Sequence, residues 1–263
     1  MYVRHYAEFF RKERAFGNMK RALIVGGANG IGLGIATELA KRTEVEKVYI
    51  VDKSKVLDEF SNPKFESFQF DLTSDDYSIF NRFQDVDTLM ITAGFGRLQL
   101  FRDIDDSMIQ TYFNVNTIPV LRIIKKFYEK LEKADTDFYC GVMVSISGFM
   151  TSPFFSVYSA TKAALKVFIE SVNVELIKSG SCNQILNVSP GSLRGTSFNA
   201  GKTDLSVLAP MANEIIEHLL KKDDLFIPQY DEVFKNVLER YHKDFRAEGI
   251  HSYEYKIESG RVK

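Results

Sequence analysis

The chain has few cysteines and no long apolar run, and both shortages limit what it can be. Only Cys140 and Cys182 are cysteines, and neither lies at a metal-ligand spacing from the four histidines. We therefore expect no metal site, and a reduced, cytoplasmic setting fits best. No stretch of about 18 apolar residues occurs, so we do not expect the chain to span a membrane.

The chain also lacks a strong excess of either charge. Its 34 lysines and arginines nearly balance 35 aspartates and glutamates, and the formal net charge is −1. We therefore expect no nucleic-acid partner, which would favour a basic surface. No internal repeat, low-complexity tract or linker divides the 263 residues, and this length suits one domain with a sizeable core.

Residues 1–18 mix arginines and aromatic residues but contain no continuous apolar run. They are therefore not expected to be a secretory signal. Two interpretations of this N-terminal extension remain open. It is either a short amphipathic helix that docks on the body or on a second subunit, or a dispensable segment that precedes a start at Met19.

From residue 19 onward, short β-branched or aromatic runs alternate with longer segments of helical period, as is typical of α/β proteins. The strands are apolar on both faces, which favours a parallel sheet covered by helices on either side. We expect strands at Arg21–Val25, Val48–Val51, Phe65–Phe70, Thr88–Thr92, Tyr139–Ser145, Gln184–Val188 and Leu225–Ile227. We expect helices near Ile31–Arg42, Asp75–Phe83, Met108–Phe113, Val115–Lys133, Val157–Lys178 and Val207–Leu220, with a C-terminal helical tail from about residue 229 that includes Asp231–Arg246.

A glycine-rich turn joins the first expected strand to the first expected helix. It comprises Gly26, Asn29, Gly30, Ile31 and Gly32 with the residues between them. Glycines permit a tight turn and let backbone N–H groups approach a pyrophosphate at the positive end of the helix. Glycines can also serve simply to pack a helix on a strand, but the position of this turn favours a nucleotide site.

The second expected strand ends at Asp52, 26 residues after Gly26. A carboxylate here accepts hydrogen bonds from an adenosine ribose and repels a 2′-phosphate. The alternative is a simple turn residue, and Lys53 and Lys55 follow it. Because Asn29 in the glycine turn is neutral, no basic residue there favours the phosphate, and we predict NAD(H) rather than NADP(H).

Tyr158 and Lys162 lie four residues apart in an expected helix, so their side chains share one face. A tyrosine has a pKa near ~10, and a positive charge beside it favours the phenolate and lowers that pKa. Such a pair can act as a general acid/base. The same spacing is also common in ordinary helices, so the pair has to be weighed with the other motifs.

Together these motifs resemble the short-chain dehydrogenases/reductases, in their single-domain Tyr-x-x-x-Lys branch, over roughly Lys20 to Ile227. The resemblance implies a Rossmann-like, doubly wound, seven-stranded and mainly parallel sheet, with residues 19–263 forming a single dinucleotide-binding and catalytic domain. It also implies a homodimer or homotetramer built partly on the helices near Val115 and Val157. The chain departs from the family pattern at Val25, Ile91 and Thr92, which replace a threonine and two asparagines.

The resemblance also assigns roles to individual residues. Asn116, Ser145, Tyr158 and Lys162 correspond to the catalytic set, with Ser147 as the alternative serine. Asp71 and Leu72 match the adenine contact, and Pro190 and Gly191 match a loop over the nicotinamide. The expected cofactor-binding residues are Gly26, Asn29, Gly30, Ile31, Gly32, Asp52, Asp71, Leu72, Ala93, Gly94, Tyr158, Lys162, Pro190, Gly191 and Thr196.

These assignments predict an NAD(H)-dependent oxidoreductase that interconverts a secondary alcohol and a ketone or aldehyde. Tyr158 would exchange the proton with the substrate oxygen, and Ser145 would hydrogen-bond that oxygen. Lys162 would lower the tyrosine pKa and bind the nicotinamide ribose, while Asn116 would hold a water that links the lysine to solvent. A non-catalytic NAD-binding regulatory or scaffold protein and a sugar-nucleotide epimerase or dehydratase remain the alternatives.

We expect a small-molecule substrate, and the sequence leaves two chemical classes open for it. Apolar and aromatic residues after Ser145 and after Gly191 favour an apolar or ring-bearing alcohol or ketone, although they also suit core or subunit contacts. Exposed arginines would instead suit a substrate carboxylate or phosphate. The residues concerned are Phe149, Met150, Phe154, Phe155, Leu193, Phe198 and Leu205 for the first alternative, and Arg97, Arg102 and Arg194 for the second.

Overall fold

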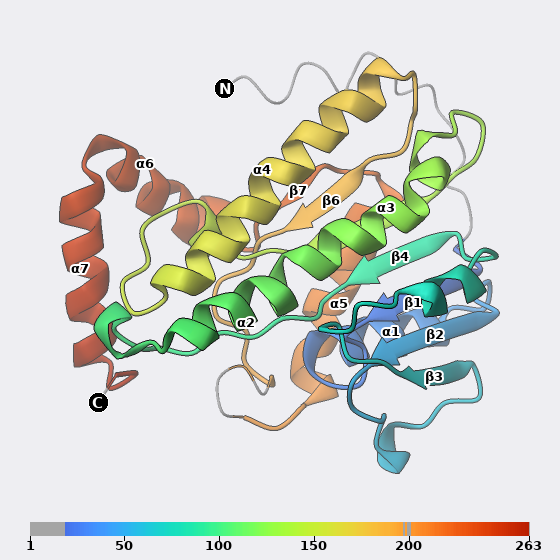
Figure 1. The fold of residues 1–263 in the computed structure, drawn as a ribbon, viewed down its shortest axis with the longest axis horizontal. Coiled ribbons are helices and arrows are strands. Elements are labelled where there is room, and N and C mark those ends of the chain that lie inside the picture. The colour runs from blue at the N-terminus through green and yellow to red at the C-terminus, as the bar shows by residue number, and fades with distance from the viewer. Residues whose placement is uncertain (1–18, 197, 199–200, 263) are drawn as a thin grey trace.

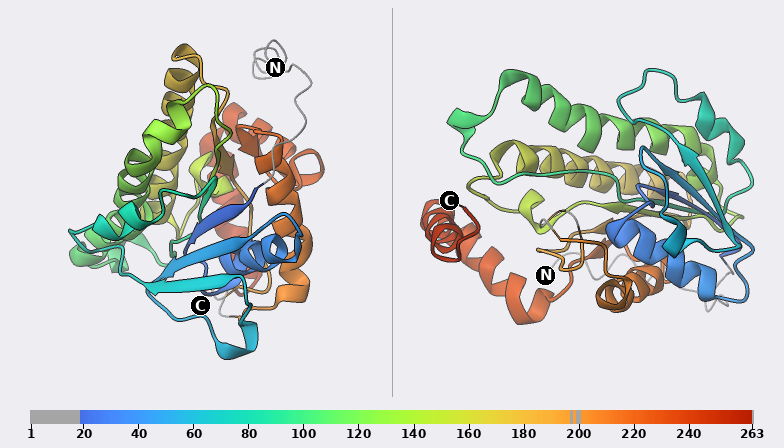
Figure 2. Two further views of the ribbon diagram at one scale, coloured as in Figure 1. Left: turned by 90° about the vertical axis from the view of Figure 1, so that its right-hand side faces the viewer. Right: turned by 90° about the horizontal axis from the view of Figure 1, so that it is seen from below.

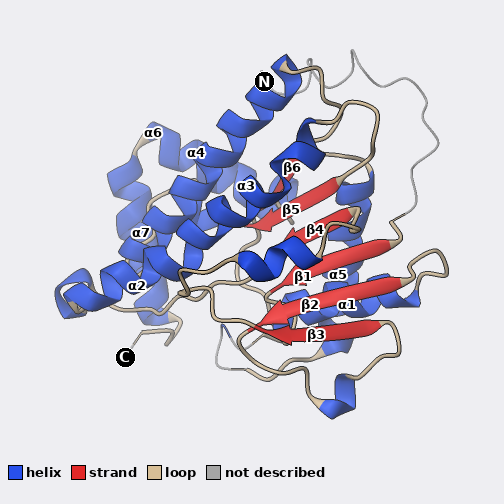
Figure 3. Ribbon diagram, turned by 45° about the vertical axis from the view of Figure 1, so that its right-hand side comes forward, coloured by secondary structure: helices blue, strands red, loops and turns tan. Residues whose placement is uncertain are grey.

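The computed structural model describes residues 19–196, 198 and 201–262, so the N-terminal extension expected at 1–18 lies outside the described residues. Seven strands form one sheet in the order β3-β2-β1-β4-β5-β6-β7, and every pairing is parallel. Figure 3 shows β1 to β5 of this sheet side by side, with their arrowheads pointing the same way. This confirms the expected doubly wound α/β fold. The strands are β1 (Arg21–Val25), β2 (Lys47–Asp52), β3 (Phe65–Gln69), β4 (Thr88–Ile91), β5 (Tyr139–Met143), β6 (Ile185–Val188) and β7 (Leu225–Phe226).

The strand order reverses direction between β1 and β4, which lie side by side in the middle of the sheet. In open parallel sheets, ligands bind at such a switch point, beyond the carboxyl ends of the strands. β1 and β4 end together there, with Val25 opposite Ile91. The glycine turn follows the first of these strands directly.

Helices cover both faces of the sheet (Figures 1 and 2). One layer contains α1 and α5, which pack against each other, and the other contains α2, α3 and α4. The helices are α1 (Gly30–Lys41), α2 (Asp106–Asn116), α3 (Ile118–Glu132), α4 (Ser156–Lys178), α5 (Leu205–Leu220), α6 (Lys235–Lys243) and α7 (Phe245–Glu258). None of the described helices is long and apolar enough to cross a bilayer.

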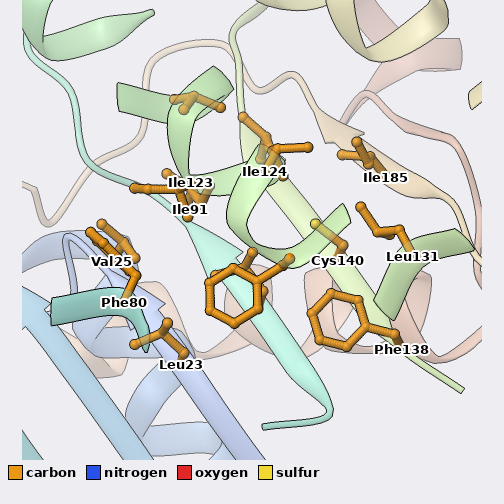
Figure 4. Close-up of a cluster of buried hydrophobic side chains, with 14 of the residues drawn as sticks. Leu23, Val25, Phe80, Ile91, Ile123, Ile124, Leu131, Phe138, Cys140 and Ile185 are labelled. Carbon is orange, nitrogen blue, oxygen red and sulfur yellow. The ribbon is translucent and has the colours of Figure 1, made fainter. Parts of the chain in front are cut away.

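The two faces carry separate apolar cores, as a parallel sheet covered on both sides requires. Figure 4 shows the core under α3, where Leu23, Val25 and Ile91 of the strands meet Phe80 and Ile123. All residues of β4 and β5 are buried. β3 differs from the expectation of strands apolar on both faces, because it is an edge strand whose exposed positions are polar.

The helix expected at Asp75–Phe83 is instead a short 3₁₀ segment, Ser78–Arg82. The carboxylate of Asp76 accepts hydrogen bonds from the backbone N–H and the hydroxyl of Ser78. Such local bonds compete with a regular helix. The apolar periodicity reflects Tyr77, Phe80 and Phe83 packing into the core rather than a longer helix.

The long helix expected at Val115–Lys133 is broken at Thr117, whose φ of −120° and ψ of −64° separate α2 from α3. Pro119 lies in the first turn of α3, where its missing N–H costs nothing, but it could not continue α2. Asn116 is therefore the last residue of α2 and not the start of a long helix.

The C-terminal tail extends beyond the single helical segment expected at Asp231–Arg246, and it consists of separate helical segments. A π-helical turn, Tyr230–Phe234, leads into α6, and Asp244 separates α6 from α7. The Asp244 carboxylate accepts the N–H groups of Arg246 and Ala247, so it caps α7. In Figure 1 both helices lie on the side toward which the strand arrowheads point.

Candidate active site

The glycine turn is packed too closely to accept side chains at two positions. Gly26 has a φ of +86°, and a Cβ there would lie 2.6 Å from Ala93 Cα. A Cβ on Gly32 would overlap the carbonyl oxygen of Gly26. Thr92 donates its hydroxyl to the same oxygen, at 2.9 Å, so this replacement for a family asparagine still braces the turn against β4.

The N-terminus of α1 lies at the far end of this turn. Asn29 precedes the helix and its carbonyl accepts the N–H of Leu33, while Ile31 is buried in the first turn. Gly30 has a φ of +54°, and its N–H donates to the hydroxyl of Thr203 at 2.9 Å. An anion at this helix end would compete with that hydroxyl for the same N–H.

The Asp52 carboxylate connects the glycine turn to the loop after β2. One oxygen accepts the N–H of Ala28 at 3.0 Å and the other accepts the N–H of Ser54 at 2.9 Å. Asp52 is thus both a turn residue and a fixed negative group beside the glycine turn. A shallow hollow adjoins it, lined by Lys53, Ser54, Gln69, Phe70 and Asp71.

Asp71 and Leu72 follow β3 at the edge of this hollow. Asp71 accepts the N–H and the hydroxyl of Thr73, which with Lys53 hold its pKa below the ordinary value. The carbonyl of Leu72 accepts the hydroxyl of Tyr77 at 2.7 Å. The structure therefore brings the residues expected at the adenine and ribose to the same edge of the sheet.

Tyr158 and Lys162 lie in the first two turns of α4 and are 8% and 3% exposed. Lys162 Nζ lies 5.7 Å from the centroid of the Tyr158 ring and donates to the carbonyl of Met143 at 2.9 Å. The pair therefore faces the end of β5, beneath the protein surface.

Burial controls the proton affinities of both groups. It raises the pKa of Tyr158 to about 12, an effect that a hydrogen bond with Ser145 partly offsets, and it lowers the pKa of Lys162 to about 8. Desolvation disfavours the charged phenolate and is the largest influence on the pKa of Tyr158. That Lys162 lowers the tyrosine pKa stays a prediction.

Ser145 follows β5 and its side chain meets the phenol of Tyr158. Ser147 donates both its N–H and its hydroxyl to Ser145 Oγ, at 3.2 and 2.9 Å. Of the two alternative serines, Ser145 is therefore the one in contact with Tyr158, and Ser147 supports it.

Asn116 is completely buried and its amide holds the loop after β4. Its Oδ1 accepts the N–H of Phe95 at 2.9 Å, and its Nδ2 donates to the carbonyl of Phe95 at 2.8 Å and to Thr161 at 3.3 Å. A Cβ on Gly94 would lie 3.3 Å from Asn116 Oδ1 and 3.4 Å from Lys162 Nζ. Asn116, Gly94 and Lys162 therefore meet at one point, next to Ala93.

The loop after β6 spans the distance from Ser145 to the glycine turn. The carbonyl of Pro190 accepts the N–H of Ile146 at 3.0 Å. Thr196 is buried, donates to the carbonyl of Leu193 and lies where a Cβ on Gly30 would be 3.7 Å away. A Cβ on Gly191 would lie 2.7 Å from the ring of Phe234, so the C-terminal tail also touches this loop.

Two aromatic rings pack beside Tyr158. The ring centroids of Phe155 and Phe198 lie 5.3 and 5.5 Å from that of Tyr158. Tyr112 stacks on Phe95 and its hydroxyl accepts the N–H of Arg97. Arg97, Arg102 and Arg194, considered as anion ligands, are all exposed.

Sequence reasoning missed two parts of this site. Tyr112 lies near enough to Tyr158 to raise its pKa, and Lys256 of α7 contacts the loop that precedes Tyr158. Neither residue belongs to a local motif. No local sequence pattern indicated either contact.

The site and the sheet together define an α/β dinucleotide-binding fold with a buried tyrosine–lysine pair at its switch point. Residues 20–205 match the sequence profile of the family described as short chain dehydrogenase. This match covers more than half of the chain. The protein therefore belongs to the short-chain dehydrogenase family of oxidoreductases, as the sequence predicted.

Individual relatives agree with this assignment. A farnesol dehydrogenase from Aedes aegypti is 26% identical over 190 residues, which is 66% of this chain and 78% of that protein. The structure of an alcohol dehydrogenase from Thermococcus sibiricus complexed with 5-hydroxy-NADP superposes with a TM-score of 0.66 at 23% identity, covering 80% of this chain and 95% of that one. A short chain dehydrogenase/reductase from Burkholderia phymatum in complex with NAD gives 0.74 at 14% identity, covering 89% and 96%. The two structures support the fold.

Proposed function

We propose that this protein uses a nicotinamide cofactor to interconvert an alcohol and a carbonyl compound. The observation that carries the proposal is the convergence of Ser145, Tyr158 and Lys162 beyond the end of β5. A buried phenol, a hydroxyl bonded to it and a buried amine form a proton-transfer site.

The residues at the switch point suit a dinucleotide. Gly26 and Gly32 leave no room for side chains, so they let the turn close tightly against Ala93 and Thr92, as a tight phosphate-binding turn requires. The pyrophosphate would lie at Gly30, the ribose at Asp52 and the adenine at the hollow beside Asp71. When bound, the nicotinamide would supply or accept the hydride.

Tyr158 would exchange the proton at the substrate oxygen, donating it during reduction and accepting it during oxidation. With a pKa of about 12 the phenol is protonated at neutral pH, which is the form that reduction requires. Ser145 would donate a hydrogen bond to the same oxygen as negative charge develops there. Lys162 would stabilise the phenolate and bind the nicotinamide ribose.

We propose NAD(H) as the preferred cofactor. Asp52 is held in place by two backbone N–H groups, so its negative charge cannot easily move away from a 2′-phosphate. Lys53 lines the same hollow and acts in the opposite direction. One comparison structure contains 5-hydroxy-NADP and another contains NAD, and the affinities of this chain for NADH and NADPH test the preference directly.

We further propose an apolar or ring-bearing substrate in a cytoplasmic homodimer or homotetramer. Phe155 and Phe198 pack beside Tyr158, and one relative is named for an apolar alcohol, farnesol. Val167, Val174 and Ile177 are exposed on the outer face of α4, which supports a subunit contact there.

The proposal is tested by following absorbance at 340 nm with NADH and with NADPH over a panel of apolar, cyclic and polar ketones and aldehydes. We expect cofactor consumption with an apolar carbonyl compound and a faster rate with NADH. Binding of NADH without turnover across the panel would overturn the proposed activity. Faster turnover with NADPH would overturn the cofactor preference alone.

A further inference from the structure

Lys256, near the end of α7, is a charged residue in a buried position, with 8% of its surface exposed. Its ammonium donates to the hydroxyl of Ser152 at 2.9 Å and to the carbonyl of Pro153 at 2.8 Å. Neither acceptor carries a charge, and burial together with Arg261 lowers the pKa of Lys256 to about 8. A buried cation whose two hydrogen-bond acceptors are neutral costs free energy, so we ask what these bonds to a distant loop do.

The same loop is held at a second point by α7. Phe154 stacks on Tyr253, with ring centroids 4.6 Å apart, and its carbonyl accepts the N–H of Gln99. Phe154 has a φ of +67°, a left-handed conformation that is uncommon for a bulky residue and persists only where its surroundings enforce it. The contacts with α7 therefore hold the 150–155 loop in a strained conformation.

α7 is itself fixed in direction. Arg240 of α6 forms a two-pronged ion pair with Glu248 of α7, at 2.6 and 3.0 Å, and Glu248 is only 8% exposed. Such paired hydrogen bonds fix geometry as well as charge. With the cap at Asp244, they make the corner between α6 and α7 a firm support for Lys256.

The loop that α7 holds leads directly to the proposed proton donor. Lys256 Nζ lies 5.6 Å from the ring of Phe155, which packs against Tyr158. The carbonyl of Phe155 accepts the N–H of Ser159, so Phe155 is the N-cap of α4. A shift of the loop would therefore move both the start of α4 and the ring beside Tyr158.

We propose that Lys256 is a positioning residue: through Ser152 and Pro153 it holds Phe155 against Tyr158, and so shapes the wall of the substrate site. The helices α6 and α7 then act as the support of that wall. The kinetic part of this inference rests on the proposed function, whereas the structural part does not.

The structural part can be tested without a substrate, because the chain contains no tryptophan. Phe155→Trp places the only indole in the protein at the contact. Adding Lys256→Met should shift its emission to the red and increase its quenching by acrylamide. Adding Lys243→Met, which removes an exposed lysine of α6, should change neither. An emission spectrum that is the same with and without Lys256 would overturn the inference.

The kinetic part uses the native Phe155 and the carbonyl compound turned over fastest in the 340 nm panel. In Lys256→Met we expect KM for that compound to rise about tenfold, or 1.4 kcal/mol, with little change in kcat or in the dissociation constant of NADH. Lys256→Arg, which keeps the charge and the donors, should recover part of the loss.

The possible results separate this inference from its alternatives. A parallel loss of NADH binding, kcat and thermal stability would reveal a general structural role and overturn the positioning role. Kinetics equal to those of Lys243→Met would overturn it as well. If no compound in the panel is turned over, the proposed function fails, and the fluorescence still decides whether Lys256 holds the loop.

Discussion

The two ends of the site are built in different ways. At the cofactor end, Gly26 and Gly32 are set by close backbone approach, and Thr92 and Asp52 bond to backbone groups nearby in space. At the proposed substrate end, Phe154 stacks on Tyr253 and Phe155 lies beside Lys256, and each partner is about a hundred residues away in the chain. We therefore expect the cofactor end to tolerate few substitutions. The residues at the substrate end are expected to vary more, according to the substrate that is bound.

The largest expected effect is at Tyr158, where the proposed cofactor and substrate ends of the site meet. Tyr158→Phe removes only the hydroxyl and keeps the ring between Phe155 and Phe198, so we expect kcat to fall by at least ~10²-fold, the lower range for general acid/base catalysis. The measurement is the steady-state rate at 340 nm with saturating NADH. Tyr255→Phe, at an exposed tyrosine of α7, is the control and should retain the rate. Near-normal turnover in Tyr158→Phe would remove Tyr158 from the mechanism.

A change at the cofactor end should act through binding and stability. In Gly32→Ala the added Cβ overlaps the carbonyl of Gly26, so we expect a loss of about 1–3 kcal/mol of stability and of most NADH affinity. Urea unfolding and NADH fluorescence titration measure the two effects. Gly34→Ala, whose Cβ would lie 3.3 Å from Leu208 Cβ, is the milder comparison. Equal behaviour of the two variants would show that the turn tolerates a side chain.

The cofactor preference should respond to a single charge. Asp52→Asn keeps an acceptor for Ala28 or Ser54 but removes the negative charge, so the ratio of NADPH to NADH affinity should rise about tenfold, or 1.4 kcal/mol. Lys53→Met should change the ratio in the opposite direction. Dissociation constants of both cofactors measure this. An unchanged ratio of NADPH to NADH affinity in Asp52→Asn would show that residues other than Asp52 set the cofactor preference.

A further expected effect is a pH dependence of stability. Because the pKa of Lys162 falls from 10.5 in the unfolded chain to about 8 in the folded one, the unfolded state binds more protons between these values. Stability from this group should therefore rise with pH across that window, by at most about 1.4 kcal/mol per pH unit. Tyr158 has its pKa raised from 10 to about 12, so its contribution falls above pH 10.

Urea midpoints at pH 8 and pH 10 test this behaviour for Lys162. The wild-type protein should gain more stability over this interval than Lys162→Met does. Lys256 also has its pKa lowered to about 8, so Lys256→Met should lose part of the same gain. If Lys162→Met and wild type respond alike, the buried lysine does not titrate in this window.

Much of the cofactor end could be predicted from the sequence because its signals are local. Gly26, Gly30 and Gly32 lie within seven residues, and Asp52 ends the next strand. The helix spacing of Tyr158 and Lys162 likewise places them on one face. The pKa of Tyr158 could not be predicted this way, because its burial depends on α2, the 150–155 loop and the loop after β6.

The amino-acid sequence alone indicated the seven strands through their short-range periodicity, and it indicated the family through the resemblance of its motifs, whose residue types at the switch point reflect backbone limits. Only the tertiary structure decided that Asn116 ends a helix and holds Phe95, that Ser145 rather than Ser147 meets Tyr158, and that α7 supports the site through Lys256. These contacts join residues that are far apart in the chain. A local sequence pattern does not indicate which distant side chain will pack against a buried residue.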